Sequence, residues 1–394
     1  MADIAMVYDR SETDELGIRL VAEEMGIDLE YLPFYKIAVG ISNNGFTYRS
    51  LGRDYTKEVE GLGVILNRTQ SKNRRIFGTA IFESLGKDVL NPLSVELSCQ
   101  SKIRTLLSFY ERGIRIPETV YIPSNVQESR VRGGILDNLG AVSDLIAKQL
   151  GVGKIVTKPD AGTHGRDVRL SEDHESLREV LVEIAPSITN PAGVVAQEFI
   201  PKWFYDLRIV VEKKKGGTGF CHPTALARGG FKDFRTNTYL GNTVFRANLP
   251  AVVQKESIKC GEALSSGSDS WIIALDAMPY IGEVDGSDEA ELRLSFDALE
   301  EPFKEVLDVK RKPNKKRDFA AYTRDIEDAY TKYMSTEAYS HIKGVIDETL
   351  ETYKGTVLFH EGNACPEFWE QTRIVGGVNI AESLMTCAKS LLDR

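Results

Sequence analysis

The chain has 394 residues, of which 42% are hydrophobic and 27% are charged, a balance typical of globular proteins and not of disordered chains. This length predicts about two or three domains. The formal net charge of −9 argues against bulk binding to nucleic acid. No apolar run approaches the roughly 18 residues that a membrane-spanning helix needs, and the amino terminus lacks the basic start of a signal peptide. We therefore expect a cytoplasmic protein that binds neither nucleic acid nor membrane.

The cysteines give no sign of a disulfide framework or of a structural zinc site. They are odd in number and scattered, and no two of them have a CxxC spacing. We expect buried thiols at Cys99, Cys221, Cys260, Cys365 and Cys387.

Two units of a strand followed by a helix open the chain. Residues 4–9, IAMVYD, predict a strand, and residues 10–26 repeat apolar side chains at helical spacing. The segments GVILNRT (63–69) and RIFGTAIFESLG (75–86) repeat this order. Strand, helix and strand in succession predict a small parallel α/β domain that ends near residue 92.

The chain after this unit predicts one helix and then a change of texture. Residues 94–113 predict a single helix, capped by Ser94 and stopped at Gly113. From Lys154, short β-branched runs alternate with glycine-rich turns, which predicts antiparallel strands. A charged and partly helical stretch over 283–356 interrupts these strands, after which a strand and an amphipathic helix are expected to close the chain.

The segment KPDAGTHGRDV (158–168) predicts a strand end, a glycine turn and a second strand. Glycines let backbone amides approach phosphate oxygens, and Lys158 adds a point charge, so the loop is suited to hold a nucleotide. An ordinary hairpin explains the same letters equally well. The order of residues in a Walker A loop is absent.

A second group of polar residues follows much later in the chain. Asp276 ends an apolar strand, and Glu361 and Asn363 lie two positions apart, which places them on one face of a strand. Carboxylate and amide oxygens suit a hard cation such as Mg²⁺ that is also held by nucleotide phosphates. A purely structural pair on a buried strand is the alternative.

Taken together, these motifs resemble the ATP-grasp carboxylate-amine ligases, and specifically the RimK-like branch of glutamate ligases and lysine-biosynthesis carrier-protein ligases. The resemblance implies an α/β and α+β chain with the ATP-grasp fold: an N-terminal parallel α/β (pre-ATP-grasp) substrate domain at 1–92, a central lid subdomain at 93–198, and a C-terminal antiparallel-sheet subdomain at 199–394 with an insertion at 283–356.

The resemblance also implies roles for single residues. It makes Arg228, Arg235 and Lys158 catalytic. It makes Asp276, Glu361 and Asn363 ligands of two metal ions, Mg²⁺ or Mn²⁺. The expected ATP site consists of Lys102, Lys158, Gly162, Thr163, His164, Gly165, Gln197, Glu198, Phe199, Ile200, Asp206, Arg208 and Asn237.

The activity that the resemblance implies is ATP-dependent formation of an amide through an acylphosphate, with an amino acid and a carboxylate-bearing small molecule or acidic protein as partners. Glutamate is the first expected amino acid. A ligase acting on an amino-group carrier protein in lysine or arginine biosynthesis is the alternative within this class. An ATP-binding regulatory or kinase-like grasp protein is the alternative from another class. A homo-oligomer is common in the family.

Two departures from the family pattern concern the site. Asp276 and Glu361 are separated by 84 residues, where the family has a brief hairpin, so Glu283 or Asp285 could take the place of Asp276. The glycine pair that follows the RTN motif in the family is Gly241 and Asn242 here.

Further polar residues lie after the expected N-terminal strands. Because open α/β sheets bind ligands at the carboxyl ends of their strands, an acidic amino acid or acceptor is expected to contact Arg10, Arg68, Ser71 and Arg74. His360 is expected on the strand face opposite Glu361, packed and without a role. The run KRKPNKKR (310–317) predicts a solvated loop, with a dock for an acidic protein or a polyanionic cofactor as the alternative.

Overall fold

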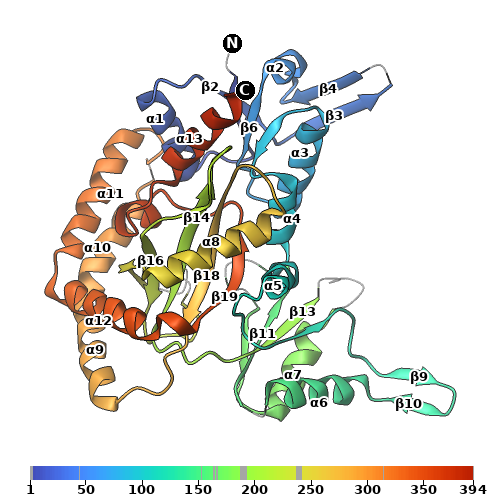
Figure 1. The fold of residues 1–394 in the computed structure, drawn as a ribbon, viewed down its shortest axis with the longest axis vertical. Coiled ribbons are helices and arrows are strands. Elements are labelled where there is room, and N and C mark those ends of the chain that lie inside the picture. The colour runs from blue at the N-terminus through green and yellow to red at the C-terminus, as the bar shows by residue number, and fades with distance from the viewer. Residues whose placement is uncertain are drawn as a thin grey trace.

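The computed structural model describes residues 3–43, 45–151, 153–162, 165, 167–186, 193–236, 242–313 and 315–393 (Figure 1). A parallel sheet with its helices occupies one end of the molecule, a large antiparallel sheet lies in the middle, and a smaller antiparallel sheet lies at the other end. Thr163, His164, Asn237 and Gly241, which the sequence motifs single out, lie outside the described residues.

The N-terminal parallel sheet forms as the sequence predicts, in the strand order β2-β1-β6-β7. Its strands are short and apolar, and β1 and β6 are buried along most of their length. A three-stranded antiparallel sheet, β3-β4-β5, is inserted between β2 and β6, and our sequence analysis did not predict it. The elements are β1 (Ile4–Tyr8), α1 (Thr13–Glu24), β2 (Leu29–Pro33), β3 (Ile37–Ser42), β4 (Gly45–Ser50), β5 (Arg53–Asp54), α2 (Thr56–Gly61), β6 (Val64–Asn67), α3 (Lys72–Ser84) and β7 (Asp88–Leu90).

The last helix of the chain, α13 (Ile380–Leu392), packs against this N-terminal sheet beside α1, and the two termini lie close together in Figure 1. Gly17 of α1 leaves room for Trp369, which lies in the segment before α13, because a Cβ at position 17 would lie 2.1 Å from the Trp369 indole. The first and last segments of the chain therefore share one hydrophobic core.

The single helix predicted over 94–113 is wrong. The chain forms α4 (Leu93–Gln100) and α5 (Lys102–Glu111), separated at Ser101, whose backbone is extended with φ −121° and ψ 132°. The Ser101 hydroxyl accepts a hydrogen bond from the Arg104 amide and so caps α5. Ser94 does not cap α4, because it lies inside this helix and Pro92 occupies the cap position. Gly113 has φ +64°, as expected after a helix end.

The central sheet has the order β12-β11-β13-β8 and is antiparallel throughout. Helices α6 and α7 pack together and contact this sheet, and a separate hairpin, β9 and β10, projects from it (Figure 1). The elements are β8 (Thr119–Ile122), β9 (Ser129–Val131), β10 (Gly134–Leu136), α6 (Asn138–Leu150), β11 (Ile155–Pro159), β12 (Arg169–Ser171), α7 (His174–Ile184) and β13 (Val194–Glu198).

The large antiparallel sheet has the order β17-β16-β14-β18-β19, with β15 paired to β14. Strands β14 and β18 are its buried centre, and α8 packs against them. The elements are β14 (Tyr205–Lys213), β15 (Phe220–Cys221), β16 (Thr224–Gly229), β17 (Thr243–Asn248), α8 (Ala251–Ser265), β18 (Trp271–Pro279) and β19 (Val357–Asn363), followed by a π-helical turn, η3 (Gln371–Val375).

The stretch between β18 and β19 consists of helices that pack on the edge of this sheet, with α12 against β17. The basic run lies between α10 and α11, and several of its cations pair within the chain: Lys310 with Glu370 at 2.8 Å, and Lys316 with Glu12 at 2.9 Å. These pairs favour a structural explanation of the run. The helices are α9 (Gly286–Ala298), α10 (Glu300–Lys310), α11 (Phe319–Met334) and α12 (Glu337–Tyr353), and a short turn, η2 (Lys354–Thr356), leads into β19.

The fold class expected from the sequence is confirmed: a parallel α/β sheet and antiparallel sheets with helices occur in one chain. Within the described ranges, the cysteines are free thiols, and all but Cys365 are buried. In the same part of the chain, every helix is too short or too polar to cross a lipid bilayer.

Candidate active site

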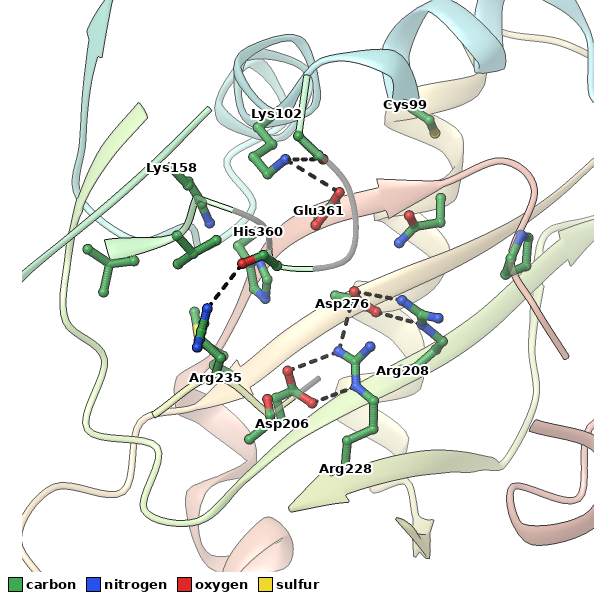
Figure 2. Close-up of a pocket in the computed structure, with 18 of the residues that line it drawn as sticks. Cys99, Lys102, Lys158, Asp206, Arg208, Arg228, Arg235, Asp276, His360 and Glu361 are labelled. Carbon is green, nitrogen blue, oxygen red and sulfur yellow. Dashed lines mark hydrogen bonds and ion pairs between the residues drawn. The ribbon is translucent and has the colours of Figure 1, made fainter. Parts of the chain in front are cut away.

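One cavity of about 340 Å³ collects side chains from all three parts of the chain. The N-terminal part and α5 contribute Gln70, Lys72 and Lys102, the central sheet contributes Lys158, and the large sheet contributes five further charged groups. Figure 2 shows the lysines, arginines and carboxylates of this cavity facing one another. The charged residues at the large sheet are Asp206, Arg208, Arg228, Asp276 and Glu361.

The floor of the cavity is a ladder of alternating charges that follows from strand register. Asp206 lies opposite Arg228 across β14 and β16, and Arg208 lies opposite Asp276 across β14 and β18. The Arg228 guanidinium donates to both oxygens of Asp206 at 2.8 and 2.9 Å, and Arg208 donates to Asp276 at 2.9 and 3.0 Å. A further ion pair at 3.3 Å between Arg228 and Asp276 joins the two pairs. Cross-strand pairing therefore holds four charged groups in one connected network of ion pairs.

This ladder sets the protonation of its members. Burial opposes charge at Asp276, but Arg208 and Arg228 outweigh it and lower the pKa of that carboxyl. In the same way Asp206 and Asp276 raise the pKa of Arg228 in spite of its burial. Asp276 and Arg228 are thus charged at neutral pH. To act on a substrate, Arg228 would have to release one of these contacts. Its expected catalytic role stays a prediction.

Strand β19 carries a β-bulge that changes the expected position of His360. Asp276 pairs with Glu361 and Ala277 pairs with Phe359, so His360 has no partner across the ladder. The bulge places His360 on the wall of the cavity together with Glu361 and Asn363 (Figure 2). The expectation that His360 faces away from the cavity is therefore wrong. Burial and then the Lys158 ammonium lower the pKa of His360 to about 4, so the ring is neutral.

Lys102 reaches the cavity from the first turn of α5. Its ammonium donates to the carbonyl oxygens of Asp160 at 3.3 Å and Gly162 at 3.0 Å, and lies 3.8 Å from Glu361. The Asp160 carboxylate holds the helix in turn, because it accepts hydrogen bonds from the Ser101 hydroxyl at 2.7 Å and the Ile103 amide at 2.9 Å. The glycine loop and the start of α5 are thereby joined into one unit.

Lys158 is the buried lysine with least compensation. It is 8% exposed, and among the described residues no carboxylate lies within ion-pair distance of its ammonium. Burial and the neighbouring Lys102 lower its pKa to about 8. An ammonium in this position is stabilised by an anion brought from solution, which is the chemistry expected of a phosphate-binding lysine.

The glycine loop also contacts the opposite wall. The Arg235 guanidinium forms a two-pronged pair with Asp233 at 2.9 and 2.7 Å and donates to the Gly165 carbonyl oxygen at 3.3 Å. Gly165 has φ +67°, a conformation that glycine adopts without strain. The Asn242 side chain donates to the Arg235 carbonyl oxygen at 2.8 Å. Arg235 therefore lies where it could touch a group held under the loop.

Residues 197–200 of the expected ATP site form the hinge, which we define as the segment that joins the central sheet to the large sheet. Gln197, Glu198, Phe199 and Ile200 all line the cavity. The Gln197 amide donates to the Thr119 hydroxyl at 2.9 Å, and a Glu198 carboxylate oxygen accepts from the Glu118 amide at 2.9 Å. Apolar side chains that would flank a flat base come from both sheets: Val156, Val168, Leu226 and Met278.

The metal ligands expected from the sequence lie close together, but they differ in how far their polar atoms are already paired within the protein. Both carboxylate oxygens of Asp276 already accept from arginines. Glu361 has one ion pair, and the amide nitrogen of Asn363 is buried without a hydrogen-bond partner among the described residues. In the described ranges no group of three His, Cys, Asp or Glu side chains is arranged around a common point. Glu361 and Asn363 fit a hard cation, whereas Asp276 would have to exchange an arginine for it.

Neither alternative to Asp276 lies at the cavity. Asp285 caps α9 by accepting a hydrogen bond from the Ser287 amide at 2.8 Å, and Glu283 is outside the lining. The long insertion therefore leaves Asp276 in its place opposite Glu361, since the pairing of β18 with β19 brings the two together.

The four residues expected to contact substrate lie outside the cavity lining. Arg68 is buried and faces Asp14 at 3.4 Å and Glu15 at 3.5 Å, so it stabilises the interior. Ser71 caps α3, Arg74 pairs with Asp9 at 3.2 Å, and Arg10 is exposed. The geometry does not support the predicted substrate contacts of these side chains, because their partners are within the protein or in solvent.

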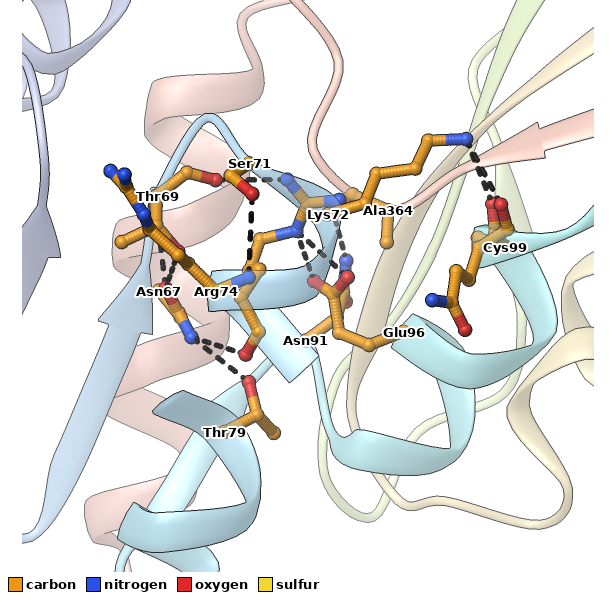
Figure 3. A network of polar contacts seen from close by, with 12 residues as sticks. Asn67, Thr69, Ser71, Lys72, Arg74, Thr79, Asn91, Glu96, Cys99 and Ala364 are labelled. Carbon is orange, nitrogen blue, oxygen red and sulfur yellow. Dashed lines mark hydrogen bonds and ion pairs between the residues drawn. The ribbon is translucent and has the colours of Figure 1, made fainter. Parts of the chain in front are cut away.

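Sequence reasoning missed several cavity residues, among them two lysines and a histidine. Lys72 begins α3, and its ammonium lies 3.4 Å from the carbonyl oxygens of Cys99 and Gln100 at the end of α4 (Figure 3). Lys202 follows the hinge and donates to the Thr236 hydroxyl at 3.0 Å, and His360 completes the set. Burial lowers the pKa of Lys72, and it lowers the pKa of Lys202 to about 8. The sequence offers one signal for the two lysines: each lies only a few positions from a residue that the motifs single out.

The comparison with known proteins agrees with this arrangement. Residues 134–293 match the model of the RimK-like ATP-grasp domain. The chain is 25% identical over 239 residues to an alpha-aminoadipate–LysW ligase, LysX, of Sulfurisphaera tokodaii, covering 60% of this chain and 73% of that protein. It is 28% identical over 264 residues to a probable alpha-L-glutamate ligase of Stenotrophomonas maltophilia, covering 66% and 81%.

Solved structures share the fold over the whole length. The ATP-grasp ligase PsnB in complex with a minimal precursor has a TM-score of 0.54 at 12% identity, and covers 100% of this chain and 98% of that chain. PsnB has also been solved with a minimal precursor, Mg and ADP, with a TM-score of 0.53 at 12% identity, covering 99% and 96%.

Proposed function

We propose, on the premise that the chain is an ATP-grasp ligase with a RimK-like domain, that it joins an amino acid to a carboxylate on a small cofactor or a protein. Glutamate is our first choice of amino acid. The observation that carries the proposal is the buried Lys158, whose ammonium has no anionic partner among the described residues and faces Glu361 and Lys102 across one cavity.

The reaction needs two displacements. A carboxylate oxygen of the acceptor attacks the γ-phosphorus of ATP, ADP leaves, and an acylphosphate remains. The amine nitrogen then attacks the acyl carbon, phosphate leaves, and the nitrogen loses a proton to give the amide. Lys102 and Lys158 would hold phosphate oxygens, since fixed cations offset the charge that builds on the transferred group. Arg235, at the glycine loop, would hold the acylphosphate.

A divalent cation held by Glu361 and Asn363, with Asp276 as the third candidate, would supply further charge compensation at the phosphates. We infer a place for Mg²⁺ or Mn²⁺ from this donor set, and the number of ions stays a prediction. The Arg208 and Arg228 pairs keep the Asp276 carboxylate ionised, so it is ready to exchange an arginine contact for a metal contact.

The second substrate would enter from the N-terminal side. Lys72 and Gln70 line that end of the cavity, and among the described residues the Lys72 ammonium has two contacts, both long and both to carbonyl oxygens. A carboxylate would complete its contacts. We therefore assign substrate binding to the N-terminal unit at 1–92, the phosphate loop to the unit at 93–198, and the metal to the unit at 199–394.

Two alternatives share the nucleotide site. The carboxylate could instead belong to an acidic carrier protein, and one relative is named an alpha-aminoadipate–LysW ligase. A regulatory protein that binds ATP without turnover is the alternative from another class. The arginine and aspartate ladder favours catalysis, because a protein that only binds ATP has no need for a charge network of this extent.

The proposal is tested by ADP release from ATP and Mg²⁺ while single amino acids are added to pooled metabolites and small acidic proteins. We expect turnover that depends on glutamate. Lys158→Met should lower kcat/KM for ATP by about 100-fold or more, since removal of one preorganised charge contact costs about that factor. Lys148→Met, the same change at an exposed lysine of α6, is the matched control and should leave turnover unchanged.

Other outcomes decide between the alternatives. Turnover only when an acidic protein is present would support the carrier-protein alternative. Nucleotide binding without turnover in every mixture would support the regulatory one. Full activity of the Lys158→Met variant would contradict the assignment of the phosphate site.

A further inference from the structure

His360 is the one histidine on the cavity wall in the described part of the chain. It reaches the wall only because of the bulge between Asp276 and Ala277, which leaves it unpaired in the ladder. Without the bulge, alternation along β19 would turn His360 and Glu361 to opposite faces. The backbone irregularity therefore has a defined effect: it adds one side chain to the cavity.

Both ring nitrogens of His360 are buried and lack a hydrogen-bond partner among the described residues. A neutral imidazole has one N–H donor and one acceptor nitrogen, so both capacities are unused. Buried polar atoms usually have partners, and each exception costs free energy unless water or a ligand compensates it. A packing role alone leaves this cost unexplained, because an apolar ring would fill the same space without it.

The position of His360 along the cavity indicates what would compensate it. The end of β18 lies at the hinge, where the Ile281 amide donates to the Pro201 carbonyl oxygen at 3.0 Å. From this end, β19 presents His360 first, then Glu361 and then Asn363. A nucleotide with its base at the hinge and its terminal phosphates at Lys102 and Glu361 would therefore place its middle section over His360.

We propose that His360 forms a hydrogen bond to the middle section of the bound nucleotide, at an oxygen of the ribose or of the α-phosphate. This inference rests on the proposed function, since it assumes a nucleotide in the cavity. The two oxygen sources differ in chemistry, because a ribose hydroxyl both donates and accepts, whereas a phosphate oxygen only accepts.

The test measures the Kd of ADP with Mg²⁺ by isothermal titration for the wild-type chain and for His360→Phe, which keeps a ring of similar shape. We expect a Kd about 3- to 10-fold higher in the variant, the usual effect of one lost hydrogen bond. His360→Gln and His360→Asn place an amide near Nε2 and Nδ1 respectively, and the variant that restores binding identifies the nitrogen used. His341→Phe is the control. His341 lies in α12 and outside the cavity lining, so this change should not alter the Kd.

A spectroscopic measurement separates contact from packing. In the wild-type chain labelled with ¹⁵N-histidine, we expect addition of ADP and Mg²⁺ to shift one ring nitrogen that is absent from the His360→Phe spectrum. The 2′-deoxy and 3′-deoxy forms of ADP distinguish the sources: a smaller penalty in His360→Phe with one of them identifies that hydroxyl, and an unchanged penalty with both identifies the phosphate.

The failures are distinguishable. If wild-type protein does not bind ADP, the proposed function and this inference both fall. If it binds ADP, but His360→Phe binds equally well and no ring nitrogen shifts, the inference alone is overturned.

Discussion

Lys202 shows what a buried cation costs when no ligand is present. It is 7% exposed, and within the described ranges its ammonium donates one hydrogen bond, to the Thr236 hydroxyl. Burial lowers its pKa from 10.5 to about 8 in the folded chain. A shift of this size corresponds to about 3 kcal/mol by which the charged lysine disfavours folding at neutral pH.

Lys202→Met should therefore stabilise the ligand-free protein at pH 7, by up to about 3 kcal/mol. The unfolded chain keeps this proton until about pH 10.5, whereas the folded chain loses it near pH 8, so wild-type stability should rise between these values. The rise should be smaller in the variant, in which Lys158 still contributes its own part. Urea denaturation at pH 7 and pH 9.5 measures both effects, with Lys148→Met as the exposed control. A variant less stable than wild type at pH 7 would show that the lysine is compensated in the apo protein.

At the level of elements, Asp160 joins the glycine loop to helix α5. Its carboxylate accepts from Ser101 and Ile103, so it acts at the N-terminus of the helix that presents Lys102. The carbonyl oxygen of the same residue accepts from the Lys102 ammonium at 3.3 Å. The position of Lys102, one of the two lysines that we propose bind phosphate, thus depends on a single aspartate from the neighbouring loop.

Asp160→Ala should lower the free energy of unfolding by about 1–2 kcal/mol, as for other lost caps, and should also weaken ADP binding because Lys102 is no longer fixed. Asp173→Ala is a matched control, since Asp173 caps α7 by accepting from the Ser176 amide at 2.8 Å. The control should lose stability and keep its affinity for ADP. Equal effects of the two variants on ADP binding, measured by titration calorimetry, would contradict the role of Asp160.

The elements also show where sequence reasoning succeeds. Strand and helix periodicity predicted β1, α1, β6 and α13, because each has a local pattern of apolar residues that tertiary contacts do not override. The break at Ser101 was missed because the sequence on both sides is helical, and the break is stabilised by Asp160, a residue distant along the chain. The bulge at His360 has the same character, since it exists only in the pairing of β19 with β18.

In the candidate site, the motif residues Lys102, Lys158, Glu361 and Asn363 line one cavity, whereas the predicted substrate arginines do not. The difference has a physical origin. A motif constrains several neighbouring positions at once, but a lone arginine after a strand can equally form an internal ion pair. Arg68 does so with Asp14, which lies 54 positions before it. It also donates a hydrogen bond to the Pro366 carbonyl oxygen, 298 positions after it.

At the level of the whole molecule, Arg68 connects the N-terminal unit to the segment that follows β19. Its guanidinium faces Asp14 and Glu15, donates to the Pro366 carbonyl oxygen at 3.2 Å and lies over the Phe368 ring. Asp14 accepts from the Trp369 amide at 2.8 Å on the other side. These contacts hold the N-terminal end of the cavity, with Lys72 and Gln70, against the wall that carries Glu361 and Asn363.

Arg68→Met should lower the free energy of unfolding by about 3–5 kcal/mol, because it leaves Asp14 and Glu15 buried without a cation. Arg74→Met provides the matched control: Arg74 is exposed and pairs with Asp9, so its loss should cost no more than about 1 kcal/mol. Adding Asp14→Asn and Glu15→Gln to Arg68→Met should recover part of the loss, since no uncompensated charge then remains in the interior. Urea denaturation of the four proteins measures the differences. If Arg68→Met costs no more than Arg74→Met, the ion pair does not hold the N-terminal unit in place, and the cavity must be closed by the packing of α1 and α13 alone.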